Sequence, residues 1–195
     1  MKTVFFDVDT QIDFLYPAGA LYVPGAEHIV PTVTRLNRFA AAQGIPLISD
    51  TDAHTENDSE FRSWPPHCVA GTTGQLKPQA TLLDRRVSLS SKAPLVQWPE
   101  RAQQILLEKQ TLDAFSNPQL PGFLEALEAE RFVVYGVVTE ICVKCAAWGL
   151  LKTGKRVEMV TDAVRHLDES ASRSMFREFE DKGGVLTTSD QVCAA

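Results

Sequence analysis

The chain has 195 residues, of which 44% are hydrophobic and 23% are charged, and its formal net charge at pH 7 is −6. This length and composition predict a single domain, spanning residues 1–195, with a substantial core. The acidic balance argues against a nucleic-acid backbone or an anionic membrane surface as main partner, because both attract clustered Lys and Arg. A small-molecule substrate or a protein partner remains.

The first residues, MKTVFFDVDT, begin with an apolar run that Asp7 and Asp9 interrupt before the core of a signal peptide could form. No stretch reaches the length needed to span a bilayer. We therefore expect a cytoplasmic protein, in which thiols stay reduced. The four cysteines are then better interpreted as catalytic, metal-binding or buried residues than as a disulfide framework.

Strand-like and helix-like segments alternate along the chain. Residues 3–8 form a short β-rich run, residues 27–44 have apolar residues near helical spacing, and residues 45–49 are again apolar, which predicts a βαβ unit. The pattern continues with strands at 104–109 and 131–138, helices at 118–130 and 140–154, and further repeats at 156–164, 168–184 and 185–192. Continuous apolar strands between amphipathic helices indicate an α/β fold with a parallel sheet covered on both faces.

Residues whose side chains can act in catalysis or bind a metal follow the predicted strands. Asp9 follows the first strand, Asp52 and His54 follow the second, Lys109 ends a third, and Cys142 comes after residues 131–138. In parallel sheets, ligands bind outside the carboxyl ends of the strands. We therefore expect these side chains to meet at one edge of the sheet.

Cys142 has three possible roles: a nucleophile, half of a redox pair with Cys145, or a small buried hydrophobe. Thr139 is a suitable N-cap for the following helix, which would place Cys142 in the first turn, where the helix dipole and free N–H groups favour a thiolate and an oxyanion. The pattern Cys-x-x-Cys is too loose to establish a redox pair, and a structural zinc site would need a second ligand pair. Cys145 is interpreted as a packing residue.

Two charged residues favour the first of these roles, in which Cys142 is a nucleophile. Asp9, at a predicted strand end, is placed to act as a general base, although many such aspartates are only helix caps or turn residues. Lys109 would add a cation near the thiol and lower its pKa, although most isolated lysines are solvated. Asp9, Lys109 and Cys142 together, each at a strand end, favour a nucleophilic role for Cys142.

The polar stretch from Asp50 to about Gln79 is too long for an ordinary connection, and such loops are usually functional or disordered. Asp52 and His54 lie two residues apart, so their side chains can point to one cation, and Glu60 and His67 follow. This set suits zinc, with iron or manganese as alternatives. The competing interpretation is a solvated polar segment covering Trp64. His28 and His166 are expected to be structural.

Three segments together resemble the isochorismatase-like cysteine hydrolases, and within them the nicotinamidases (pyrazinamidases). They are DTQIDF with Asp9, EKQTLDAF with Lys109 and GVVTEIC with Cys142. The resemblance covers nearly the whole chain. It implies a three-layer α/β/α, Rossmann-like fold with a parallel sheet of about six strands.

The resemblance also implies roles for particular residues. Asp9, Lys109 and Cys142 correspond to a catalytic triad. A cis peptide bond between Val137 and Val138 is expected, with the backbone N–H groups of Val138 and Cys142 forming the oxyanion hole.

In the loop, the similarity to nicotinamidases implies that Asp52, His54 and His67 bind a divalent metal ion that holds the pyridine nitrogen of the substrate. Some shorter bacterial members add a Glu at the place of Glu60. Two aromatic residues flank the substrate ring in these enzymes, and Phe14 and Trp64 stand at the expected places. Two departures from the pattern concern the pocket: Tyr16 near its mouth, and the short segment around Phe115 and Ser116.

The resulting prediction is a metal-dependent cysteine amidase that hydrolyses nicotinamide to nicotinate and ammonia, a reaction of NAD salvage, through a thioester. Two alternatives stay open. One is a cysteine hydrolase of the same family that acts on another small amide or on an isochorismate-like substrate. The other is a binding module without catalysis. The family resemblance also implies a homo-oligomer.

Overall fold

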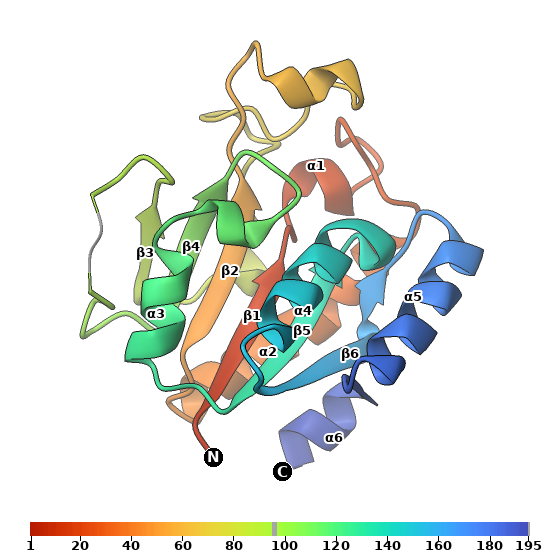
Figure 1. Ribbon diagram of the computed structural model, residues 1–195. Helices are drawn as coiled ribbons and strands as arrows, with labels where there is room; N and C mark the ends of the chain where they lie inside the picture. The colour runs from red at the N-terminus through yellow and green to blue at the C-terminus, as the bar shows by residue number, and fades with distance from the viewer. Residues whose placement is uncertain (95–96, 195) are drawn as a thin grey trace.

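The computed structural model describes residues 1–94 and 97–194. Its centre is a seven-stranded sheet with strand order β3-β4-β2-β1-β5-β6-β7 (Figure 1). Every pair of neighbouring strands in it is parallel. The strands are β1 (Thr3–Val8), β2 (Leu47–Asp52), β3 (Arg86–Leu89), β4 (Gln104–Lys109), β5 (Arg131–Val137), β6 (Arg156–Arg165) and β7 (Val185–Thr187).

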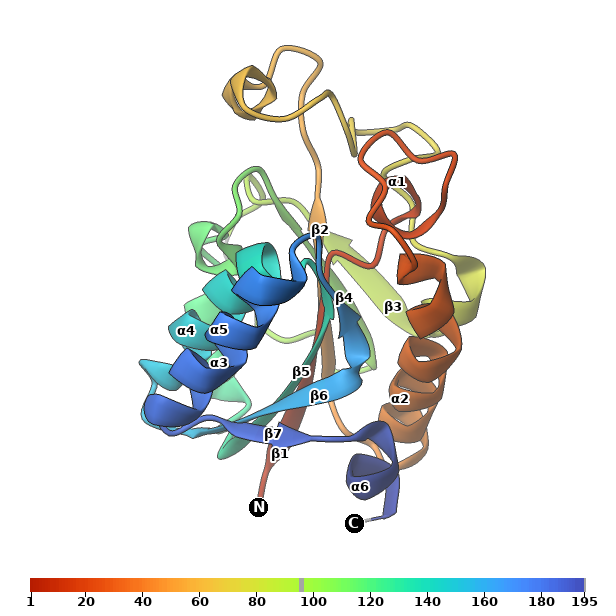
Figure 2. The same cartoon turned by 90° about the vertical axis from the view of Figure 1, so that its right-hand side faces the viewer.

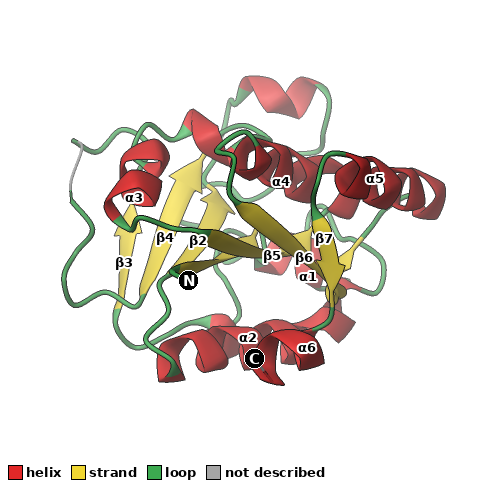
Figure 3. Cartoon of the chain, turned by 60° about the horizontal axis from the view of Figure 1, so that its bottom comes forward, coloured by secondary structure: helices red, strands yellow, loops and turns green. Residues whose placement is uncertain are grey.

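Helices cover both faces of the sheet, which gives three layers (Figure 3). On one face lie α3 (Leu120–Ala126), α4 (Lys144–Leu151) and α5 (Glu169–Asp181), and on the other lie α2 (Val30–Ala42) and α6 (Ser189–Ala194). The short helix α1 (Ile12–Leu15) follows β1. Within the described residues, no helix is both long enough and apolar enough to cross a membrane.

The predicted α/β/α architecture is confirmed, with one strand more than the six or so expected. The additional strand, β3, lies at the sheet edge, where its residues alternate between exposed and half-buried positions, so its sequence lacks the continuous apolar run of a central strand. Residues 185–192 continue the alternation as a predicted strand, but only Val185–Thr187 form a strand, β7, and the helix α6 follows from Ser189. Ser189 begins α6, and its N–H and hydroxyl both donate to the Asp162 carboxylate.

The central strands are buried because both of their faces meet helices or loops. From Val4 to Val8, β1 is fully buried, and β2 is buried over its whole length. Their apolar side chains join one continuous core. Polar residues at the carboxyl ends of these strands therefore lie in a water-poor environment, where charges interact strongly.

Adjacent strands β1 and β5 lead to helices on opposite faces, α2 and α4 (Figure 3). Such a switch point leaves a crevice at the carboxyl ends of the strands, where α/β proteins bind ligands. In Figures 1 and 2 the long loop after β2 stands above this end, and both termini lie at the other end. The predicted site residues belong to this upper end.

Candidate active site and metal centre

Lys109 is a fully buried lysine that connects two carboxylates. It ends β4 and is paired in register with Asp52, the last residue of β2. Its Nζ lies 2.5 Å from Oδ1 of Asp52 and 2.9 Å from Oδ2 of Asp9. Burial alone would lower the pKa of Lys109, but the charges of Asp52 and Asp9 raise it well above its usual value, so the lysine is a cation.

Asp9 directly follows β1 and has a left-handed backbone, with φ of 48°. Its N–H donates to Oδ1 of Asp50 (3.0 Å), a buried residue of β2 that the sequence did not single out. Among the described residues, Oδ1 of Asp9 has no nitrogen or oxygen partner, and it is buried. One oxygen of Asp9 is thus held by Lys109, and the other is left for a different donor.

Cys142 lies in a π-helical turn, Thr139–Val143, that leads into α4. The expectation that Thr139 caps this helix is wrong: Val138 is the N-cap, in extended conformation, and no side chain of the described residues makes a capping hydrogen bond there. The hydroxyl of Thr139 is instead buried without a hydrogen bond to any described residue. The peptide bond between Val137 and Val138 is cis, as the family resemblance implied.

The electrostatics of the thiol differ in part from the sequence prediction. Burial raises the pKa of Cys142 well above its usual value; Lys109 lowers it, as predicted, but Asp9, Asp52 and Asp50 act against the lysine. The resting thiol is therefore protonated. Burial is also the main cause of the raised pKa of Asp9, with Asp52 adding to it, whereas Lys109 and a hydrogen bond with Cys142 oppose it. A carboxylate with a raised pKa suits proton exchange near neutral pH.

Asp52, His54 and His67 form a buried cluster whose ligand atoms all lie within 4.8 Å of one another. Nε2 of His54 and Nε2 of His67 each lie 3.6 Å from Oδ2 of Asp52. Oε1 of Glu60 is 4.0 and 3.9 Å from the same two nitrogens. All four residues of the predicted metal site are therefore brought together, with Glu60 slightly farther out.

This cluster fits a divalent metal ion. Both ring nitrogens of His54 are buried, and neither makes a well-aligned hydrogen bond within the part of the chain that the structure describes. Burial lowers the pKa of His54, but Asp52, Asp58 and Glu60 together raise it to about 8. Burial would raise the pKa of Asp52, but Lys109 and the two histidines hold it well below its usual range. Two imidazoles beside an ionised carboxylate are a zinc-type donor set.

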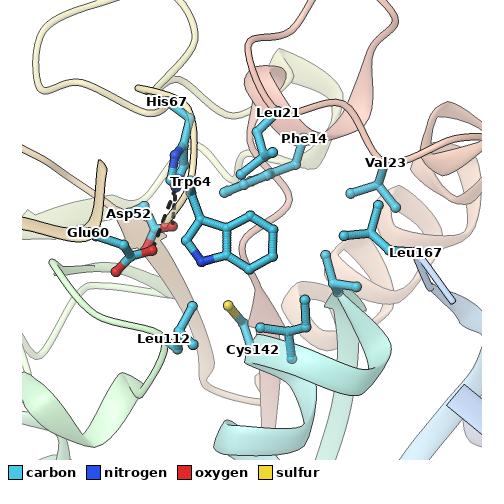
Figure 4. A pocket seen from close by; sticks show the side chains of 12 residues that line it. Phe14, Leu21, Val23, Asp52, Glu60, Trp64, His67, Leu112, Cys142 and Leu167 are labelled. Carbon is cyan, nitrogen blue, oxygen red and sulfur yellow. Dashed lines mark ion pairs between the residues drawn. The ribbon is translucent and has the colours of Figure 1, made fainter. Parts of the chain in front are cut away.

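A pocket opens beside these groups (Figure 4). Phe14 and Trp64 both line it, as does Cys142, whose sulfur points into it, while Asp52, Glu60 and His67 form one side. The remaining lining residues are apolar, and sequence reasoning did not single them out for the pocket, except Val138: Leu21, Val23, Leu112, Val138, Ile141 and Leu167.

The pocket differs from the expectation at two places, the mouth and the segment after Lys109. Tyr16, Phe115 and Ser116 are not among the described residues that line it. Phe115 packs instead against Gly149 of α4, where an added Cβ would lie 2.2 Å from its ring. Leu21 and Leu112, from the same two segments, occupy the wall. Leu167 is 43% exposed and so belongs to the open side of the pocket.

Cys145, His28 and His166, to which no catalytic role was assigned, are not among the described residues that line this pocket. All four cysteines are free thiols, and Cys145 is half-buried on α4. His28 is exposed beside Glu27, and His166 precedes α5, which Asp168 caps by accepting the N–H of Ala171 (2.8 Å).

The sequence matches the model of a known protein family. The family model for the isochorismatase domain matches residues 90–191, just over half of the chain. The chain therefore belongs to the isochorismatase family, and it is a hydrolase of that family.

Individual relatives refine this assignment. The chain is 28% identical to a nicotinamidase of Escherichia coli over 93% of its own length and 92% of that protein. It is 20% identical to an N-carbamoylsarcosine amidase of Arthrobacter, covering 95% of this chain and 67% of that one. Among solved structures, a pyrazinamidase of Pyrococcus horikoshii in complex with zinc is similar, with a TM-score of 0.79, 27% identity and coverage of 96% and 99% of the two chains.

Proposed function

We propose that this protein is a metal-dependent cysteine amidase that hydrolyses nicotinamide to nicotinate and ammonia, a reaction of NAD salvage. The observation that carries the proposal is that the candidate nucleophile and the candidate metal ligands line the same pocket. Cys142 lines the pocket on one side, and the cluster of Asp52, Glu60 and His67 lines it on another. Lys109 contacts both Asp9 and Asp52, so one buried cation joins the two groups.

The first half of the reaction forms a thioester. Asp9 takes the proton of the Cys142 thiol as the sulfur attacks the amide carbon, and Lys109 stabilises the charge of the carboxylate. The oxyanion accepts hydrogen bonds from the N–H groups of Val138 and Cys142, and loss of one such donor typically costs about 2.7–4 kcal/mol. The carbon–nitrogen bond then breaks, and Asp9 gives its proton to the nitrogen, which leaves as ammonia.

The second half releases the acid. Asp9 removes a proton from a water molecule, whose oxygen attacks the thioester carbon. The carbon–sulfur bond breaks, nicotinate leaves, and the sulfur of Cys142 recovers the proton. Because the thiol is protonated at rest, the first half needs a base, and Asp9 is ionised again for the second half once ammonia has left.

The remaining residues recognise the substrate ring. Phe14 and Trp64 offer aromatic surfaces within a mostly apolar pocket, which suits a flat heteroaromatic ring. Asp52, His54 and His67, with Glu60, would hold the ion, for which zinc is proposed, with iron or manganese as alternatives. When bound, the ion supplies a Lewis-acid contact to the ring nitrogen.

A second candidate function is the hydrolysis of another small amide or of an isochorismate-like substrate. The similarity to an N-carbamoylsarcosine amidase favours it. A substrate panel separates the two: nicotinamide, pyrazinamide, N-carbamoylsarcosine and isochorismate, each with the zinc-loaded and the chelated protein. Metal-dependent turnover of the two heteroaromatic amides supports the proposal. Turnover of another substrate that is indifferent to chelation would replace it with the second candidate.

The proposal also includes the organisation of the protein. Residues 1–195 are proposed to act as one domain, in the cytoplasm, as a homo-oligomer with a small-molecule substrate and no nucleic-acid or membrane partner. Size-exclusion chromatography with light scattering measures the assembly.

A further inference from the structure

Each of the two histidines in the metal cluster has an oxygen atom close to its Nδ1, on the side of the ring away from Asp52. Nδ1 of His67 lies 2.7 Å from the carbonyl oxygen of Pro65, and Nδ1 of His54 lies 3.1 Å from Oδ2 of Asp58. Their Nε2 atoms both face Asp52. A metal-bound imidazole usually donates its other N–H to a carboxylate or a carbonyl, which fixes the tautomer and the ring orientation.

Asp58 has a second contact in the same loop. Its Oδ1 accepts the N–H of Glu60 (2.9 Å) and so caps the short 3₁₀ helix Ser59–Arg62. Glu60 in turn places its carboxylate about 4 Å from both Nε2 atoms. One oxygen of the Asp58 carboxylate thus lies 3.1 Å from Nδ1 of His54, and the other accepts the N–H of Glu60.

We propose that Asp58 is a positioning residue of the metal centre, which keeps the proton of His54 on Nδ1 and fixes Glu60 beside the ion. The inference rests on the metal-binding part of the proposed function and is independent of which amide is hydrolysed. The burial of both residues supports the inference. The side chain of Asp58 is only 11% exposed to solvent, and that of His54 is fully buried. A negative charge facing Nδ1 also raises the basicity of Nε2 and so strengthens its bond to a metal ion.

A purely structural role makes a different prediction. If Asp58 only capped the 3₁₀ helix, Asn would replace it well, because Asn is as good a cap as Asp. A carboxylate has two acceptor oxygens, whereas an amide has one acceptor and one donor. In Asp58→Asn the NH₂ group must therefore face either the N–H of Glu60 or the Nδ1–H of His54. The first loses the cap, and the second favours the wrong tautomer of His54.

The test is zinc affinity, measured by competition with a chelating indicator, in the wild type, Asp58→Asn and Glu56→Gln. Glu56 is an exposed acid in the same loop, so its variant removes the same charge without the contact. We expect zinc affinity to fall about 10–100-fold in Asp58→Asn and to be unchanged in Glu56→Gln. The visible spectrum of the cobalt-loaded proteins should change only in Asp58→Asn, because it reports the ligands around the ion.

Wild-type zinc affinity and an unchanged cobalt spectrum in Asp58→Asn would overturn the inference. If that variant does not fold, Asp58→Ser serves instead, because serine caps Glu60 but is too short to reach His54; the same fall is expected. A wild type that binds no zinc would overturn the metal site itself. A fall in zinc affinity together with no hydrolysis of nicotinamide would refute only the proposed substrate.

Discussion

Lys109 Nζ lies 2.5 Å from Oδ1 of Asp52, directly across the β2–β4 pair, and both residues are buried. This contact joins the proposed metal ligand to the proposed triad, because the same ammonium is 2.9 Å from Asp9. Two buried carboxylates thus share one cation. Removing that cation leaves charges in the interior without compensation.

Lys109→Met should therefore lose both activity and stability. Removing one partner of a buried ion pair typically costs about 3–5 kcal/mol. Denaturant unfolding of the metal-free proteins measures the change, with Lys155→Met as control, because Lys155 is an exposed lysine. Equal unfolding free energies for the two variants would contradict the assigned contacts.

Cys142→Ala and His54→Ala should separate chemistry from metal binding. The first should abolish ammonia release and keep the zinc content, because the thiol lies outside the Asp52–His54–His67 cluster. The second should lower the zinc content and weaken substrate binding. Zinc content by atomic emission and turnover are measured on the same samples. Equal zinc loss in both variants would refute this division of roles.

Gly136→Ala should prevent normal folding. Gly136 has a φ of +124°, and an added Cβ would lie 2.0 Å from the carbonyl oxygen of Val8 on the paired strand β1. The expected loss exceeds about 4 kcal/mol, as is typical of such severe changes. Gly122→Ala is the control. Gly122 lies in α3, and a Cβ added there would meet no atom of another part of the described chain within 4 Å, so this variant should stabilise the protein by roughly 0.4–1 kcal/mol. Similar thermal unfolding of the two variants would contradict the tight β1–β5 approach.

Glu158→Gln should destabilise the protein at neutral pH but not in acid. Glu158 is buried on β6 and accepts hydrogen bonds from Arg131 (2.6 Å) and Arg156 (2.5 Å). Burial would raise its pKa, but the two arginines lower it below the ordinary value of 4.5. A lowered pKa gives stability that is present above pH 4.5 and is lost as the pH falls through the folded-state value.

At pH 7 the expected cost of Glu158→Gln is about 1.5–3 kcal/mol, since charge-assisted hydrogen bonds are lost. The difference between wild type and variant should shrink steadily once the pH falls below 4.5. Unfolding free energies over a pH series measure it. A difference that stays constant across the series would show that the charge of Glu158 contributes nothing.

The strands that form the centre of the sheet could be predicted from sequence because both of their faces are buried. β1 and β4 have the predicted bounds, 3–8 and 104–109. The predicted 45–49 strand begins two residues later and extends to Asp52, because pairing with β4 continues to Lys109. The edge strand β3 has no apolar run and could not be recognised.

The site was predictable where a residue type is rare and its place after a strand is clear, as for Cys142 and His54. Asp58 was not, because an aspartate in a polar loop resembles any turn residue until the loop folds back on His54. Leu21, Leu112 and Leu167 likewise come from separate loops that meet only in the folded chain. The raised pKa of Cys142 depends on burial, which spacing does not reveal.

The proposed amidase activity is tested most directly by ammonia release from nicotinamide, measured for the zinc-loaded protein, for the same protein after chelation, and for Cys142→Ala. We expect release by the zinc-loaded wild type, loss on chelation with recovery when zinc is returned, and none from Cys142→Ala. Release that persists without metal, or that survives the loss of the thiol, would contradict it.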